Sequence, residues 1–322
     1  MKDYLNYRGD FRNLSKKDLE TLFIRLKDYH LKYRDHLGID SKISFGVELE
    51  FQDVLLYYVK KELSKDECFK SWSVHEDKSC TYQIDDFAVG GEISSPILHD
   101  IDIDWKILAE VLQCLKRLKA RSTEETAFQV HVGAQVFEQD IRNVVNFVKL
   151  WCVFEHVIFK FSYGESVTYR PKILYFAHPI AEVTKLKCDR IPMFLDNLSC
   201  PKRLGYDKKW TLNFQNYSFL SSDEEVNNDI EIRCANGLLD KNMIQNTIYF
   251  YFKLMLYVMN DSFDEDYINY LFQHLQIKEF DDYSKTYVQD VLLLVDLIFD
   301  NSLDKINFLK QYIKKDEIVF VR

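Results

Sequence analysis

The sequence predicts an α+β fold: a mainly antiparallel sheet with flanking helices, followed by a helical C-terminal region. Two observations lead to this prediction. Short segments with strand-like alternation of apolar and polar residues recur before Gly237, and beyond it the periodicity is helical to about residue 314. Strands interspersed with helices and then a helical tail are typical of α+β proteins, and alternating strands favour antiparallel pairing.

The first helix is expected to begin at Ser15, because Asp18 follows three residues later at the spacing of a capping box. Gly38 is expected to end this helix, since glycine commonly follows a helical C-terminus. The apolar residues between these limits recur at helical spacing and predict one buried stripe: Leu19, Leu22, Phe23, Leu26, Tyr33 and Leu37.

The other elements before Gly237 follow from periodicity and from breaker residues. The expected strands lie at 43–52, 72–74, 90–96, 128–132, 209–219 and 229–235, and the expected helices lie at 53–63, 102–119 and 140–161. The stretch 164–207 contains four of the five prolines and has no strong period, so we expect a long functional loop region there. An acidic loop at 221–225 separates the last two strands.

Length and composition predict one domain over residues 1–322. The chain is 47% hydrophobic and 15% aromatic, which is enough for a large core. The domain is expected to have three parts: an N-terminal helical segment at 1–40, a sheet core at 41–237 and a helical C-terminal part at 238–322.

Charge and composition argue against several classes of partner. A net charge of −9 provides no basic surface for nucleic acid or for an anionic membrane. Residues 1–4 lack the apolar stretch of a signal peptide, and the apolar run at 291–295 is far shorter than the roughly 20 residues of a membrane span. Seven cysteines without a Cys-x-x-Cys pair indicate reduced, mostly buried thiols, so we expect a cytoplasmic protein.

Three of the expected strands share one pattern, in which two polar side chains stand at positions i and i+2. Residues two apart lie on the same face of a strand. The pairs are Glu48 and Glu50, Gln129 and His131, and Glu231 and Arg233. Any half-buried antiparallel strand that faces water alternates in this way, which is the simpler interpretation. However, two carboxylates at ~4 Å repel each other by roughly 4 kcal/mol at an effective dielectric of about 20, so a cation is expected nearby.

To bind phosphate, this chain would need a structure other than a glycine-rich loop. Glycine is scarce, with nine residues, and neither of the two common glycine-rich phosphate loops is present. Metal ions and arginines would therefore have to hold the phosphates of a nucleotide.

An ordered set of segments resembles the amidoligase family, which belongs to the carboxylate–amine ligase superfamily of glutamine synthetase and glutamate–cysteine ligase. The segments are Gly46–Phe51, Asp77–Ser79, Gly91–Ile97, Val130–Gly133, Glu231–Arg233 and Asn236–Gly237. The resemblance spans about residues 43–255. It implies a curved antiparallel sheet that forms a funnel, with ATP entering at one end and two or three Mg²⁺ ions at the waist.

The resemblance also implies a reaction and its partners. ATP phosphorylates a substrate carboxylate, and an amine then displaces the phosphate to give an amide. The cofactors implied are ATP and Mg²⁺, and the partners are a small-molecule or peptide carboxylate and an amine. The superfamily suggests glutamate-like substrates. Mg²⁺ prefers oxygen ligands, and the planar fork of arginine suits phosphoryl oxygens, so the residue types agree with this chemistry.

The resemblance assigns a role to each site residue. Glu48 and Glu50 resemble ligands of different metal ions, and Glu92 resembles a ligand of the ion nearer the carboxylate substrate. His131 and Glu231 resemble ligands of the ion nearer the ATP phosphates. Arg233 resembles the arginine that neutralises the transferred phosphoryl group, and Arg170 matches a further arginine that contacts phosphate. Gln129 stands where many relatives carry the first histidine of His-x-His; its amide can coordinate or hydrogen-bond at the nucleotide site.

Simpler interpretations of these residues stay open. Glu92 can be a surface residue at a strand end, His131 a hydrogen-bonded core histidine, and Glu231 and Arg233 a salt bridge. Asp77 and Ser79 are expected to form a turn. The histidines that lie outside this pattern are given no role: His75, His99, His156 and His178.

Two other functions compete with an ATP- and Mg²⁺-dependent ligase. One is a metal-dependent hydrolase that uses the acidic cluster to activate water. The other is a binding or regulatory module of the same fold without catalytic activity, which the replacement of a histidine by Gln129 favours.

Overall fold

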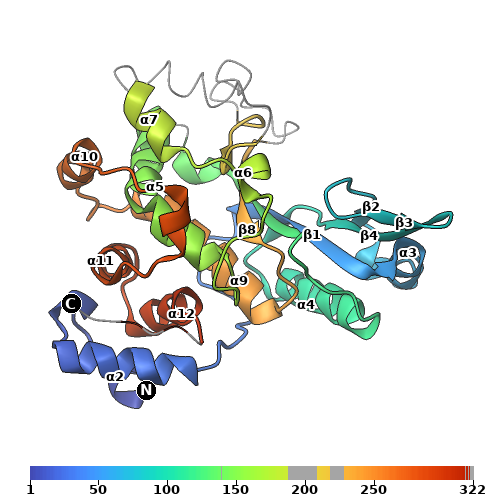
Figure 1. Cartoon of the computed structure of the whole chain (residues 1–322), viewed down its shortest axis with the longest axis horizontal. Coiled ribbons are helices and arrows are strands. Elements are labelled where there is room, and N and C mark those ends of the chain that lie inside the picture. Colours follow the sequence, from blue (N-terminus) through green and yellow to red (C-terminus); the bar gives the residue numbers. More distant parts are fainter. Residues whose placement is uncertain (139, 188–208, 218–227, 316, 318, 320–322) are drawn as a thin grey trace.

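The computed structural model describes residues 1–138, 140–187, 209–217, 228–315, 317 and 319. Helices flank a mainly antiparallel, open sheet, as the sequence predicts (Figure 1). The closure of this sheet into a funnel and the presence of a single domain stay predictions. The acidic loop at 221–225 and most of the loop region beyond Lys187 lie outside the described residues.

Six strands of the sheet follow one another in the order β2-β4-β1-β6-β8-β7, while β3 pairs with β4 and β5 pairs with β1. All of these pairs are antiparallel. The strands are β1 (Ser44–Leu55), β2 (Ser73–His75), β3 (Tyr82–Ile84), β4 (Phe87–Ser94), β5 (Leu98–His99), β6 (Ala127–Gly133), β7 (Leu212–Asn213) and β8 (Asp229–Asn236). Because β1 lies inside the sheet, it joins the strands before residue 100 to the strands after it.

The helices precede, interrupt and follow the strands. They are α1 (Lys2–Leu5), α2 (Lys16–Lys27), α3 (Leu56–Leu63), α4 (Asp102–Arg117), α5 (Ile141–Ser162), α6 (Ile173–Phe176), α7 (Ala181–Lys187), α9 (Lys241–Tyr257), α10 (Glu265–Gln273), α11 (Val288–Ile298) and α12 (Ser302–Tyr312). The helices α2, α10, α11 and α12 lie on the side away from β2–β4 (Figure 1).

One face of the sheet packs on helices and forms the core. The ring of Phe45 on β1 stacks on Trp105 of α4, with centroids 5.0 Å apart, and meets Phe252 of α9 edge-on at 5.9 Å. Cys234 of β8 points to the same side, where it contacts Tyr251 of α9. Because strand residues alternate in direction, the polar residues of these strands occupy the opposite face.

The first helix begins as predicted but ends earlier. The hydroxyl of Ser15 accepts a hydrogen bond from the Asp18 amide and donates one to its carboxylate, so Ser15 is the N-cap of the helix. The helix ends at Lys27, not near Gly38. Leu37 is nevertheless buried, although it lies in a segment that is neither helix nor strand.

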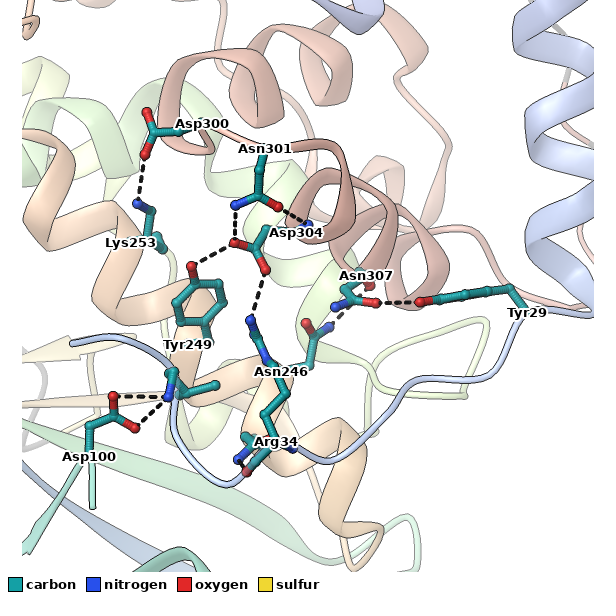
Figure 2. Close-up of polar contacts among 12 residues, drawn as sticks. Tyr29, Arg34, Asp100, Asn246, Tyr249, Lys253, Asp300, Asn301, Asp304 and Asn307 are labelled. Atoms are coloured by element: carbon teal, nitrogen blue, oxygen red, sulfur yellow. Dashed lines mark hydrogen bonds and ion pairs between the residues drawn. The ribbon is translucent and has the colours of Figure 1, made fainter. Parts of the chain in front are cut away.

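Long-range polar contacts explain why this segment is not helical (Figure 2). The backbone amide and carbonyl of Arg34 both bond to the side chain of Gln245 on α9. The Arg34 guanidinium bonds to Asp304 of α12 at 3.0 Å, and Tyr249 of α9 donates to the same carboxylate at 2.7 Å. Backbone groups that helical bonds would have used are thus satisfied by α9, which ties the N-terminal segment to the C-terminal helices.

Asp100 fixes the end of the same segment. Its carboxylate accepts the backbone amides of Leu37, at 2.7 and 2.9 Å, and Ile39, at 2.8 Å, and the indole N–H of Trp105 at 2.7 Å. The side chain is buried. A single carboxylate therefore holds the segment that leads into β1 against α4.

Replacing Asp100 with alanine is expected to lower the free energy of unfolding by about 3 kcal/mol or more, because three buried donors lose their acceptor. Chemical denaturation measures this effect. Asp102→Ala is the matched control, since Asp102 is exposed in the first turn of α4 and contributes through the helix dipole by less than about 1 kcal/mol. Equal losses in the two variants would contradict the assigned role of Asp100.

Several boundaries differ from the sequence predictions. The strand expected at 209–219 is the two-residue β7, and 218–219 lie outside the described residues. The expected loop region at 164–207 contains α6 and α7. Two short strands, β3 and β5, were not predicted: the three residues of β3 are exposed and β5 has only two residues, so neither has a recognisable alternation.

Two expectations about composition can be compared with the structure. The five cysteines within the described ranges form no disulfide, and four of them are buried, as predicted. Among the described residues, no helix has the length and apolar character needed to cross a membrane.

Candidate active site

The strand register brings the predicted site residues together on the polar face of the sheet. Four strands contribute, and each cross-strand pair joins polar residues. Glu92 of β4 is opposite Glu50 of β1, Glu48 of β1 is opposite Gln129 of β6, and His131 of β6 is opposite Glu231 of β8. The i, i+2 pattern thus becomes a continuous polar surface across β4, β1, β6 and β8.

Three of these residues form a compact group that we call the triad: Glu48, His131 and Glu231. One ligand atom from each lies within 4.8 Å of the others. The Nε2 atom of His131 lies 3.2 Å from a carboxylate oxygen of Glu48 but makes no hydrogen bond, although it is buried. Two carboxylates and an imidazole nitrogen that face one another in this way are suitable ligands for a divalent cation.

Asp229 orients the triad histidine. Its carboxylate lies 3.1 Å from Nδ1 of His131, so Nε2 is left to face Glu48 and Glu231. Burial alone would lower the pKa of His131, but the carboxylates of Asp229 and Glu48 raise it to about 10. A carboxylate behind a ligand histidine commonly fixes its ring and tautomer. Asp229 was not predicted, although it extends the alternation of Glu231 and Arg233 by one step.

Arg233 contacts the triad directly. Its guanidinium forms an ion pair with Glu231, and its Nε donates to the carbonyl of Phe176 at 3.1 Å. The second oxygen of Glu231 accepts from Asn213 of β7 at 2.6 Å. The salt bridge of the simpler interpretation is therefore present, and it lies beside His131 rather than on an isolated sheet edge.

Glu50 and Glu92 form a second acidic pair beside the triad. Burial raises the pKa of both carboxyls; for Glu92, with further contributions from Glu48, Glu50 and Asp77, the pKa is about 8. Glu50 accepts the Ala127 amide at 2.7 Å. Because Glu92 is only 5% exposed, the surface interpretation of this residue is wrong.

His75, to which the sequence analysis gave no role, contacts this acidic pair. Its Nε2 lies 2.9 Å from Glu92. The contact arises because β2 pairs with β4 and places His75 opposite Glu92. No signal within the His75 segment identifies this neighbour, since the pairing depends on a strand almost 20 residues away.

Arg170 and Gln129 each have a buried polar atom at the site that makes no hydrogen bond. Gln129 is 5% exposed, and its Oε1 accepts no hydrogen bond. Arg170 is equally buried; it donates through Nη2 to the carbonyl of Arg233 at 3.2 Å, while its Nε has no acceptor. Burial lowers the pKa of Arg170 to about 10, so it stays charged at neutral pH. An unpaired buried acceptor and an unpaired buried cationic donor suit a cation and an anion, respectively.

The turn after β2 forms as predicted. The Asp77 carboxylate accepts the Ser79 amide at 2.7 Å, the geometry of an Asx turn. Asp77 raises the pKa of both Glu50 and Glu92, so the turn lies close to the acidic pair.

Comparison with known proteins identifies one family whose model matches the chain. The family model described as "Putative amidoligase enzyme" matches residues 41–255, which include every site residue named above. No curated protein and no solved structure matches the chain. The match covers two thirds of the sequence, and its description is that of an enzyme that forms amide bonds. The chain therefore belongs to the amidoligase family.

Proposed function

We propose that the protein is an ATP- and Mg²⁺-dependent carboxylate–amine ligase that forms an amide through an acyl phosphate. The observation that carries this proposal is the triad of Glu48, His131 and Glu231, whose ligand atoms converge within 4.8 Å beside Arg233. Anionic ligands for a cation and an arginine for a phosphoryl group stand side by side, which is what phosphoryl transfer requires.

The residues present fit a divalent cation. Carboxylates favour Mg²⁺ and Mn²⁺, the buried Nε2 of His131 lacks a hydrogen bond, and the amide oxygen of Gln129 lacks a donor. The triad would hold one ion, and Glu50 with Glu92 would hold a second. These ions would supply positive charge to the phosphates of ATP.

The arginines would then act on the transferring phosphoryl group. The γ-phosphoryl passes from ATP to an oxygen of the substrate carboxylate, which gives an acyl phosphate and ADP. Arg233, from β8, and Arg170, whose guanidinium is nearby, offer charged donors to the phosphoryl oxygens. The amine then attacks the acyl carbon, the C–N bond forms, and phosphate leaves as the amine loses a proton.

Titration calorimetry with Mg²⁺ or Mn²⁺ and a non-hydrolysable ATP analogue tests the proposal. We expect the cation to bind first and the analogue to bind only with the cation. ADP formation should then require both a carboxylate and an amine. Cation-dependent hydrolysis without nucleotide would instead support the hydrolase, and nucleotide binding without any turnover would support a binding module.

Metal binding is expected to release a proton and to tighten as the pH rises from 6 to 10. The pKa of His131 is about 10 in the metal-free protein, so at neutral pH the cation must displace a proton from Nε2. Calorimetry in buffers of different ionisation enthalpy measures this proton. Binding that is independent of pH in this range would show that His131 is not a ligand.

Replacing Asp229 with asparagine is expected to weaken cation binding by about 10–100-fold, because the amide no longer fixes the charge and tautomer of His131. Electron paramagnetic resonance of bound Mn²⁺ measures the affinity and also reports the ligand set. Asp266→Asn, on the exposed surface of α10, is the matched control. If Asp229→Asn binds Mn²⁺ as the wild type does, Asp229 does not orient the ligand.

A further inference from the structure

Glu155 of α5 is a buried carboxylate that belongs neither to the triad nor to the acidic pair. It is 1% exposed and forms no ion pair with another described residue. Instead it accepts three hydrogen bonds, from the backbone amides of Ile180 at 2.7 Å and Ala181 at 3.1 Å and from the hydroxyl of Tyr283 at 3.0 Å. Burial raises the pKa of Glu155 to about 7, although these donors lower it. Burying a carboxylate without a cation is costly unless hydrogen bonds offset the cost, so the carboxylate and its donors hold one another in place.

The two backbone amides belong to residues 176–181, a segment that we call the strap. It runs from the last residue of α6 to the first residue of α7, and α7 packs against α5 (Figure 1). In the middle of the strap, the carbonyl of His178 accepts the amide of Thr211 at 2.9 Å, and the carbonyl of Thr211 accepts the amide of Arg233 at 3.0 Å. The strap therefore connects Glu155 on α5 to the strand that carries Arg233.

The first residue of the strap orients the side chain of Arg233. The carbonyl of Phe176 accepts Nε of Arg233 at 3.1 Å, and Nη1 of the same guanidinium pairs with Glu231. Because a guanidinium is planar, contacts at two of its nitrogens fix the plane of the whole group. The Phe176 carbonyl can hold this plane only while the strap keeps its position, and Glu155 binds the other end of the strap.

We propose that Glu155 is a positioning residue for Arg233, which it holds through the strap in the orientation that meets the transferring phosphoryl group. The inference rests on the proposed ligase function. Glu155 touches neither the nucleotide nor the metal ligands and acts only through the Phe176 carbonyl. Glutamine cannot replace it, because an amide has one acceptor oxygen and its NH₂ group would face a backbone N–H. Its loss should therefore weaken contact with the transferring phosphoryl group and leave ground-state nucleotide binding unchanged.

The first experiment observes Arg233 directly, in Glu155→Gln and in Asp100→Asn of the full chain at about pH 8.5, above the pKa of Glu155. Asp100 is the matched control, since it is also a buried carboxylate that accepts two backbone amides and one aromatic side-chain donor, but far from the strap along the chain. Carbon-detected NMR of ¹³C,¹⁵N-arginine-labelled protein gives the Nε signal of Arg233, which is assigned by its absence in Arg233→Ala. Glu155→Gln should move this signal towards the shift of free arginine, and Asp100→Asn should leave it in place.

The second experiment measures affinity for Mg²⁺–ADP with aluminium fluoride, a mimic of the transferring phosphoryl group, beside affinity for a non-hydrolysable ATP analogue. Glu155→Gln should bind the mimic about tenfold more weakly, the effect of one hydrogen bond to a charged group, and bind the analogue as the wild type does. In an Arg233→Ala background the same substitution should cause no further loss, because the residue through which it acts is absent. Tyr283→Phe, which removes one donor and keeps both amides bound, should show a smaller loss of the same kind.

Three results would overturn the inference: the Arg233 signal stays in place in Glu155→Gln, Asp100→Asn moves it equally, or Glu155→Gln weakens mimic binding by the same factor with and without Arg233. The last two results would show that Glu155 supports the fold in general. Failure of the ATP analogue to bind the wild type would instead reject the ligase function, and the NMR signal would still report whether the strap orients Arg233. Binding of the analogue with unchanged mimic affinity in Glu155→Gln would reject only the positioning role.

Discussion

Replacing Arg233 with alanine is expected to slow ADP formation by about 10²–10³-fold while ATP still binds, because a donor that meets developing charge acts mainly in the transition state. Both kcat and kcat/KM of the variant should fall by the same factor relative to the wild type. Metal binding should not weaken, since the Arg233 guanidinium pairs with Glu231 and competes with a cation for that carboxylate. The measurement is amine-dependent turnover beside calorimetric affinity for the Mg²⁺–ATP analogue complex.

Arg142→Ala is the control for the loss of an ion-paired arginine. Arg142 is 80% exposed at the start of α5, where it pairs with Asp140. Its removal should leave turnover unchanged. Full turnover in Arg233→Ala would show that this arginine serves only to neutralise Glu231.

The Glu231→Gln variant is expected to lose affinity for the cation and the nucleotide, whereas Arg233→Ala loses turnover. Losses of 10–100-fold are usual when a residue behind a metal ligand is changed, and removal of a ligand charge should exceed this range. The amide also places an N–H group near Arg233 or Asn213, both of which donate to the native carboxylate. Repulsion between donors therefore adds to the loss of charge.

Thermal denaturation with and without Mg²⁺ measures this effect. Ligand binding stabilises the folded state by RT ln(1+[L]/Kd), so the wild type should melt at higher temperature with Mg²⁺, and higher again with ATP. Glu231→Gln should lose both increments. Glu20→Gln, on the exposed face of α2, should keep them. Equal rises in melting temperature for the wild type and Glu231→Gln would show that Glu231 is not a ligand in the proposed metal site.

The site face could be predicted from sequence because strand geometry is local. Glu48 and Glu50 share a face whatever the rest of the chain does, and the same holds for Glu231 and Arg233. The register between strands is not local. Pairing of His131 with Glu231 joins residues 100 positions apart, and nothing within either segment determines it. Asp229 continues the alternation of Glu231 and Arg233, so extending the pattern by one step would have predicted it.

The end of α2 shows the opposite case, in which tertiary contacts overrule a local pattern. Tyr33 and Leu37 continue a helical spacing, and a helix to Gly38 satisfies every local rule. In the structure, however, the backbone of Arg34 hydrogen-bonds to the side chain of Gln245, which is more than 200 residues away. The amide of Leu37 donates to the carboxylate of Asp100. Each of these side chains supplies hydrogen bonds that a helix would supply, so propensity alone could not decide between the two conformations.

The position of β1 inside the sheet has a consequence for how such an enzyme can diversify. One strand carries both Glu48 of the triad and Glu50 of the acidic pair, so the backbone positions of these two residues are separated by a fixed step of about 6.8 Å. Hydrogen bonds to β4 on one side and β6 on the other prevent this step from changing. New substrate preferences would have to arise in segments attached to the sheet, such as the turn after β2 and α6. Grafting those two segments between relatives should therefore transfer specificity without altering the proposed phosphoryl-transfer chemistry.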